Sequence, residues 1–130
     1  MTAPHGPASI LIVDDDEAVT QTFAKMLRME GFEVRTANSA EAAFGDVRDH
    51  RPDAIILDLR MPLVDGLGFL KRLRASHLFR KIPVGIVTGD YHLEDHVAAE
   101  LRALGAEVRF KPLWLDDLVA LARTLLKVTS

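Results

Sequence analysis

Four short apolar segments of this 130-residue chain each lead into polar residues that could take part in metal or phosphoryl chemistry. The segments are residues 10–13, 54–57, 83–87 and 107–110. The polar residues that follow them are, in the same order, Asp14 to Asp16, Asp58, Thr88 and Lys111. If the segments are parallel strands of one sheet, these groups converge at its carboxyl edge, where open α/β sheets bind their ligands.

The chemistry that such a group of side chains supports is phosphoryl transfer beside a divalent metal. Magnesium prefers oxygen ligands and usually takes one or two carboxylates, for which Asp15 and Asp58 are suited, with Asp14 as an outer partner through water. A carboxylate beside the metal can also attack phosphorus and form an aspartyl phosphate. The Lys111 ammonium and the Thr88 hydroxyl would then stabilise the charge on the transferred group.

Each of these residues also has a structural interpretation. An acidic run before a helix supplies an N-cap and suits the helix dipole, although a cap accounts for only one aspartate. Asp58 would be costly to bury after an apolar strand unless it is paired or metal-bound. Thr88 alone fits a β-rich segment, and Lys111 alone would be a solvated loop residue. Their joint occurrence, at every one of the four strand ends, favours a site.

The elements that position these residues alternate between strand and helix. The strand patterns cover about residues 9–13, 32–37, 54–57, 83–87 and 107–110. The helical patterns cover about residues 17–30, a segment that starts within 38–41 and ends before Pro52, and then residues 66–76, 93–104 and 115–127. Asn38 is predicted to cap the second helix, with Glu41 able to complete a capping box. The alternation predicts a parallel sheet with helices on both faces.

Composition limits the class of protein. A chain of 130 residues with 48% apolar content fits one domain, predicted for residues 9–130 after a disordered segment at residues 1–8. A net charge of −3 without a basic run argues against direct nucleic acid binding. The absence of cysteine excludes a disulfide framework and a thiolate zinc site. Without a signal peptide or a membrane-length apolar run, a cytoplasmic location is expected.

The motifs, taken in order, resemble those of the receiver domain of two-component response regulators. They are Ile10-Leu11-Ile12-Val13-Asp14-Asp15-Asp16, Asp58-Leu59-Arg60-Met61-Pro62-Leu63-Val64-Asp65-Gly66, Val87-Thr88-Gly89, Leu104-Gly105-Ala106 and Lys111-Pro112-Leu113. The resemblance runs from about Ser9 to Lys127. It implies a flavodoxin-like, doubly wound sheet of five parallel strands in the order 2-1-3-4-5, with five helices on both faces, as in the chemotaxis receiver.

The resemblance also implies a role for each residue of the site. The implied set is the phosphoacceptor Asp58, the acidic pair Asp14 and Asp15, the metal-binding backbone carbonyl of Arg60, the switch hydroxyl of Thr88 and the phosphate partner Lys111. The implied cofactor is Mg²⁺ or Mn²⁺. The implied phosphodonor is a cognate histidine kinase, a phosphotransfer protein or a small molecule. Because family members tend to hold the lysine–proline bond cis, a cis peptide is expected before Pro112.

Two features depart from the commonest pattern of the family. Val108 occupies the position, three residues before the lysine, where receivers usually carry the aromatic residue that moves with the switch threonine. Phosphorylation is therefore expected either to act through the loop after Thr88 and the following helix without an aromatic rotamer change, or to shift populations only modestly. Arg60 and Asp90 are predicted to pair across the site opening and to slow dephosphorylation. The alternative is two solvated side chains that contribute little.

The function predicted from these features is a phosphoacceptor switch that signals by docking to an unknown downstream protein, as a monomer or weak homodimer. Its only predicted catalysis is its own phosphorylation and dephosphorylation. The alternatives are a receiver cut from a longer regulator or hybrid kinase, a phosphatase with an aspartyl intermediate, and a binding module that acts without phosphorylation. Phosphatases resembling the haloacid dehalogenases need Asp-x-Asp, whereas Leu59 and Arg60 follow Asp58.

The single tryptophan, Trp114, comes shortly after the Lys111-Pro112-Leu113 motif. Its position favours a packing role at the start of the last helix. Contact with a partner protein is the alternative.

Overall fold

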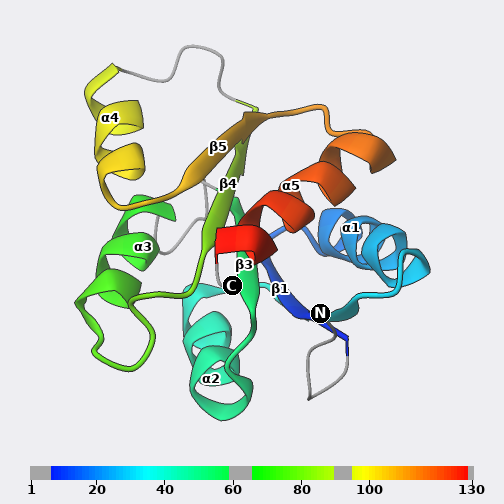
Figure 1. The fold of residues 1–130 in the computed structure, drawn as a ribbon, viewed down its shortest axis with the longest axis horizontal. Helices are drawn as coiled ribbons and strands as arrows, with labels where there is room; N and C mark the ends of the chain where they lie inside the picture. Colours follow the sequence, from blue (N-terminus) through cyan, green and yellow to red (C-terminus); the bar gives the residue numbers. More distant parts are fainter. Residues whose placement is uncertain (1–6, 59–65, 90–94, 129–130) are drawn as a thin grey trace.

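Five strands and five helices alternate along the described part of the chain in the computed structural model (Figure 1). The structure describes residues 7–58, 66–89 and 95–128. The strands are β1 (Ser9–Val13), β2 (Glu33–Ala37), β3 (Ala54–Asp58), β4 (Val84–Thr88) and β5 (Glu107–Phe110). The helices are α1 (Glu17–Met29), α2 (Ala40–His50), α3 (Gly66–Ala75), α4 (Asp95–Ala103) and α5 (Leu115–Val128). The predicted alternation is confirmed, and the observed bounds of the strands differ from the predicted ones by at most one residue.

The five strands form one parallel sheet in the order β2-β1-β3-β4-β5, as predicted. Its register aligns the strand ends that carry the polar residues. Val13 pairs with Leu57, so the residues that come next, Asp14 and Asp58, emerge side by side. Thr88 pairs with Phe110, directly before Lys111. The sheet therefore brings the ends of β1, β3, β4 and β5 to a single edge.

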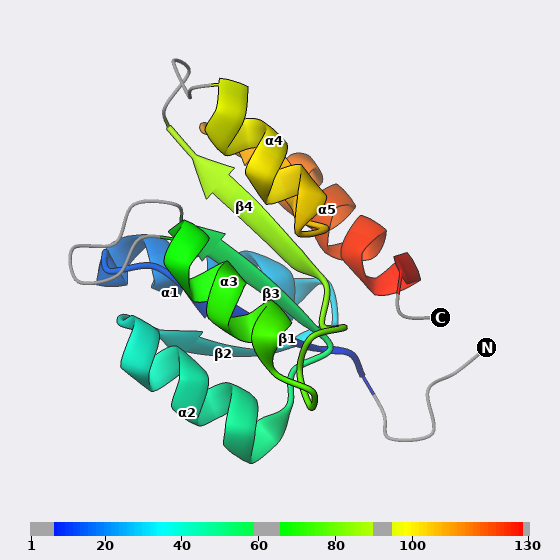
Figure 2. The same ribbon diagram turned by 90° about the vertical axis from the view of Figure 1, so that its left-hand side faces the viewer.

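The three inner strands β1, β3 and β4 are buried on both faces, which is why they are nearly continuous apolar runs. The outer strands β2 and β5 carry charged residues and are only partly buried. On one face α2, α3 and α4 cover one set of strand residues, and on the other face α1 and α5 cover the alternate set (Figures 1 and 2). Leu11 and Ile55 belong to the first layer, whereas Ile12 and Ile56 belong to the second. The period of two along each strand thus divides the core into two layers.

The N-terminal cap of α2 differs from the prediction. Ser39, not Asn38, is the N-cap, and its side chain accepts a hydrogen bond from the Ala42 backbone N–H at 3.1 Å. With the helix starting at Ala40, the third helical position is Ala42, so Glu41 cannot complete a capping box. The predicted cap was wrong by one residue because serine and asparagine are both good caps. The Asn38 side-chain amide instead donates to the backbone carbonyl of Asp14, in the acidic loop of residues 14–16, and to the Thr20 hydroxyl.

The packing role predicted for Trp114 was also wrong. Its side chain is 70% exposed, although the residues on either side of it in the sequence, Leu113 and Leu115, pack against the layer under α1 and α5. The Trp114 backbone N–H donates to the Asp117 carboxylate at 3.0 Å. The turn into α5 is therefore fixed by the hydrogen bond from the Trp114 backbone to the Asp117 side chain and by the flanking leucines, which leaves the indole facing solvent.

Gly85 lies in the middle of β4, where α5 packs directly on the strand backbone. A Cβ at this position would lie 3.1 Å from a methyl carbon of Leu121 and of Leu125. The Gly85→Val variant is therefore expected to lose about 1–3 kcal/mol of unfolding free energy through overpacking, as measured by urea denaturation. Gly89→Val is the control, because a Cβ there meets nothing within 4 Å. Equal stability of the two variants would contradict the close packing of α5.

None of the helices within the described residues is long and apolar enough to cross a lipid bilayer. Most of the predicted disordered segment, residues 1–6, lies outside the described residues, and its disorder stays a prediction.

Candidate metal and phosphorylation site

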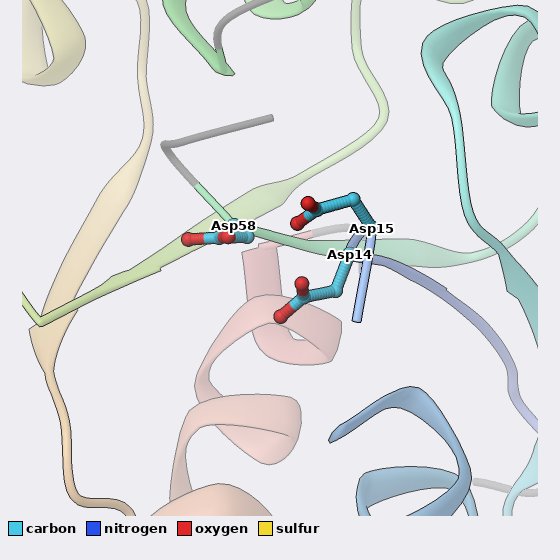
Figure 3. A group of neighbouring side chains, drawn as sticks. All are labelled: Asp14, Asp15 and Asp58. Atoms are coloured by element: carbon cyan, nitrogen blue, oxygen red, sulfur yellow. The ribbon is translucent and has the colours of Figure 1, made fainter. Parts of the chain in front are cut away.

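Three carboxylates from two neighbouring strand ends meet at the carboxyl edge of the sheet (Figure 3). Asp14 and Asp15 follow β1, and Asp58 is the last residue of β3. One carboxylate oxygen from each residue lies within 4.8 Å of one from each of the others. Among residues 7–58, 66–89 and 95–128, no other group of three acidic, histidine or cysteine side chains is close enough to hold a metal. The predicted convergence of the three aspartates is confirmed.

The two adjacent aspartates lie in different surroundings. Asp14 is buried, with 5% of its surface exposed, whereas Asp15 is exposed. The Asp14 backbone N–H donates to the Ala37 carbonyl at 3.1 Å, and its Oδ1 accepts from the Asp16 backbone N–H at 2.9 Å. Asp16 in turn is the N-cap of α1, so one of the three acidic residues does serve the helix. The remaining two are available to the site.

Burial raises the pKa of the Asp14 carboxyl to about 6, and the nearby negative charge of Asp58 adds to this rise. The Asp16 backbone N–H and the Lys111 ammonium oppose it without cancelling it. Lys111 Nζ lies 3.8 Å from Asp14 Oδ2. The ionised form of Asp14 is thus disfavoured mainly by its burial, and positive charge placed beside this carboxyl would favour ionisation.

Lys111 reaches the site from the end of β5. Its backbone N–H donates to the Thr88 carbonyl at 2.8 Å, which continues the pairing of β4 with β5 by one residue. The peptide bond between Lys111 and Pro112 is cis, the isomer that the sequence resemblance implies. A small pocket is lined by Asp14, Asp58 and Lys111 together. Thr88 is fully buried at the end of β4.

Of the remaining predicted residues, the structure describes Val108 but not Arg60 or Asp90. Val108 is half-buried and packs against the layer beneath α3 and α4. Arg60 and Asp90 lie outside the described residues, so the metal-binding carbonyl of Arg60 and the pairing of the two side chains stay predictions.

Sequence reasoning missed the part that Asn38 plays beside the site. Its side-chain amide donates to the backbone carbonyl oxygen of Asp14 at 2.9 Å. A signal was present, because Asn38 follows β2 directly and β2 is the strand next to β1. The same reasoning that joined Asp14 to Asp58 could therefore have placed Asn38 at this edge.

The ligand atoms of the acidic group, which consists of Asp14, Asp15 and Asp58, suit a hard divalent cation. Its three side chains offer only carboxylate oxygens, the ligands that Mg²⁺ and Mn²⁺ prefer. Burial, and to a lesser degree the charge of Asp58, disfavours the ionised form of Asp14. The three side chains together offer the oxygen ligands that a divalent metal ion takes.

The Asp14→Asn variant is expected to be more stable than the wild type without metal. A carboxyl whose pKa is raised by folding destabilises the folded state as the pH rises from about 4 through about 6. Asparagine keeps the shape and cannot ionise, so the unfolding free energy should rise by about 3 kcal/mol at pH 8 in chelator. The difference should become small near pH 3, where the Asp14 carboxyl is protonated in both the folded and the unfolded state. Urea denaturation at the two pH values measures this difference, and a less stable variant at pH 8 would contradict the cost of burying the ionised Asp14 carboxyl.

The family model of the response regulator receiver domain matches residues 10–123, so the chain belongs to the receiver-domain family. Among curated proteins, the transcriptional regulatory protein PrrA of Mycobacterium tuberculosis is 37% identical over 118 residues, which are 91% of this chain and 49% of PrrA. The response regulator MprA of Mycobacterium sp. (strain KMS) is 35% identical over 124 residues, 95% of this chain and 53% of MprA. The chain thus spans about half the length of these relatives.

Solved structures of single receiver domains match nearly the whole fold. The chemotaxis protein CheY4 of Vibrio cholerae superposes with a TM-score of 0.85 at 28% identity, covering 93% of this chain and 100% of its own. A putative response regulator from Chloroflexus aurantiacus gives a TM-score of 0.83 at 32% identity, covering 93% and 98%. The fold is therefore the flavodoxin-like receiver fold, as the sequence predicts.

Proposed function

We propose that this chain is a phosphoacceptor switch of a two-component system, in which Asp58 receives a phosphoryl group. The observation that carries the proposal is the meeting of Asp58 with Asp14, Asp15 and Lys111 at one edge of the sheet. Membership of the receiver family supports it, because aspartate phosphorylation is the general property of that family.

In the proposed transfer, a carboxylate oxygen of Asp58 attacks the phosphorus atom of the donor. The new bond is the acyl phosphate O–P bond, and the bond that breaks joins phosphorus to the histidine nitrogen or to the acyl oxygen of a small donor. The Lys111 ammonium, which lines the same pocket, offsets negative charge on the phosphoryl oxygens. The Thr88 hydroxyl is proposed to contact the phosphoryl group once it is attached.

Asp14 and Asp15, together with Asp58, are the residues that would hold Mg²⁺ or Mn²⁺. The metal, when bound, supplies positive charge to the oxygens of the transferred group. Asp14 is suited to a fixed position because its backbone N–H and its Oδ1 both make hydrogen bonds within the chain. Asp15, which is exposed, is suited to direct contact with an ion arriving from solvent.

The proposed partners are a cognate histidine kinase or phosphotransfer protein and an unidentified downstream protein. The names of the curated relatives, a transcriptional regulatory protein and a response regulator, support a signalling role. Direct nucleic acid binding is not proposed, because the chain has a net charge of −3. The proposed compartment is the cytoplasm, and the proposed state is a monomer or weak homodimer. Turnover of outside substrates is not proposed, since the acid of an Asp-x-Asp pair is absent after Asp58.

A second hypothesis is that the chain is the receiver portion of a longer regulator or hybrid kinase. The relatives favour it, because the chain spans about half of their length. In that case the phosphoryl chemistry is the same, and the output belongs to the remainder of the protein. The two hypotheses therefore share one site and differ only in what responds to it.

The proposal is tested by incubating the chain with acetyl phosphate, with Mg²⁺ or with excess chelator, and measuring the intact mass. A gain of one phosphoryl group with Mg²⁺ and none with chelator is expected. Equal gain in both conditions would contradict a role for the acidic group in transfer. No gain in either, together with demonstrated Mg²⁺ binding, would favour a module that acts without phosphorylation.

A further inference from the structure

The Asn38 side chain bridges the two ends of the acidic loop, residues 14–16, which carries Asp14 and Asp15. Asn38 Nδ2 donates to the Asp14 carbonyl oxygen at 2.9 Å and lies 3.4 Å from Thr20 Oγ1. The Thr20 hydroxyl already donates to the Glu17 carbonyl at 2.8 Å, so toward Asn38 it acts as an acceptor. Both neighbours of Nδ2 are therefore acceptors, and this assigns the orientation of the Asn38 amide.

The two acceptors lie on opposite sides of the acidic loop. Asp14 begins the loop at the end of β1, and Thr20, which is fully buried, belongs to the first turns of α1. The Thr20 backbone N–H donates to the Asp16 carbonyl at 3.1 Å, which joins the helix to the last residue of the loop. Asn38 thus ties the entry and the exit of residues 14–16 to the end of β2.

This bridge bears on the geometry of the carboxylates. Both backbone groups of Asp14 are held. Its N–H donates a hydrogen bond to the Ala37 carbonyl, and its C=O accepts one from the Asn38 amide. Both restraints come from the end of β2, a strand that contributes no carboxylate to the acidic group. Without Asn38, the Asp14 carbonyl and the exposed Asp15 that follows it lose one of the restraints that fix them relative to Asp58.

We propose that Asn38 is a positioning residue for the metal site, acting through the backbone of Asp14. The inference rests on the proposed function, since it concerns the affinity of the acidic group for a divalent cation. Octahedral Mg²⁺ and Mn²⁺ sites tolerate little misplacement of their oxygen ligands. Partners that orient metal ligands typically change affinity about 10- to 100-fold when removed. Because Asn38 is exposed and acts through the backbone, its loss is expected to weaken affinity about three- to tenfold.

The test is Mn²⁺ binding, followed by the electron paramagnetic resonance signal of the free ion, on the full chain and two variants. Asn38→Ala removes the bridging amide. Ser39→Ala is the matched control, because it removes the neighbouring polar side chain and the cap of α2 without touching the acidic loop. The dissociation constant should rise about three- to tenfold in Asn38→Ala and change less than about twofold in Ser39→Ala.

A second readout reports on the loop without metal. The Asp16 backbone N–H, which donates to Asp14 Oδ1, should exchange with solvent faster in Asn38→Ala and at the wild-type rate in Ser39→Ala. Unchanged Mn²⁺ affinity in Asn38→Ala, or an equal loss in both variants, would overturn the inference. Absence of Mn²⁺ binding by the wild type would instead contradict the proposed function, so the two failures are distinguishable.

Discussion

The Asp58→Asn variant is expected to take up no phosphoryl group from acetyl phosphate under conditions in which the wild type is fully modified. Asparagine retains the size of the side chain at the end of β3, but its amide cannot attack phosphorus as a carboxylate does. The measurement is intact mass after incubation with Mg²⁺. The expected effect is the largest considered, because it removes the nucleophile rather than a group that assists it.

Asp16→Asn is the matched control for this loss. This variant makes the same chemical change and removes the same charge at the same edge of the sheet. Asparagine can still cap α1 in place of Asp16. Asp16 is not a member of the group of three carboxylates, so its variant should be phosphorylated like the wild type. Full uptake by Asp58→Asn would move the acceptor to another residue and contradict the proposed role of Asp58.

The Lys111→Met variant is expected to be phosphorylated about 100-fold more slowly than the wild type, while binding Mn²⁺ at least as tightly. The Lys111 ammonium lies 3.8 Å from Asp14 Oδ2 and lines the pocket that contains Asp58. It stabilises negative charge that develops on the phosphoryl oxygens, whereas before transfer it repels a divalent cation. Rates of mass gain and Mn²⁺ titrations measure the two effects separately.

Lys81→Met controls for the loss of one positive charge, because Lys81 is exposed and precedes β4, at the opposite edge of the sheet. Its rate of phosphorylation should match the wild type. An unchanged rate in Lys111→Met would exclude the ammonium from the transfer. A parallel loss of Mn²⁺ affinity and rate would mean that Lys111 supports the metal site instead.

The fold was predictable because local patterns and the core agree. A continuous apolar run such as residues 54–57 predicts a strand that is buried on both faces of a sheet. These residues form most of β3, and all four are buried. Gly31 and Gly105 mark the ends of α1 and α4, and both have positive φ values, 94° and 80°. The choice between Asn38 and Ser39 as a cap was not predictable, because Asn38 is recruited by Asp14 and Thr20, which are distant in sequence.

The candidate site was predictable where it depends on strand ends alone. Asp14, Asp15 and Asp58 had to meet once β1 and β3 were neighbours. The burial of Asp14 beside an exposed Asp15 was not predictable, since it depends on how the loop turns into α1. The exposure of Trp114 was missed for a similar reason, because the flanking leucines supply the packing.

The measurement that tests the central claim most directly is the location of the phosphoryl group in the wild-type chain. Borohydride reduces an acyl phosphate to an alcohol and releases phosphate, which converts a phosphorylated aspartate into homoserine. Trypsin does not cleave between Arg51 and Pro52, so Asp58 lies in the tryptic peptide of residues 49–60. Asp14 and Asp15 lie in a different peptide, which ends at Lys25. Homoserine at position 58, formed only after incubation with acetyl phosphate and Mg²⁺, is the predicted result. Homoserine at another position, with an unmodified Asp58, would contradict the account.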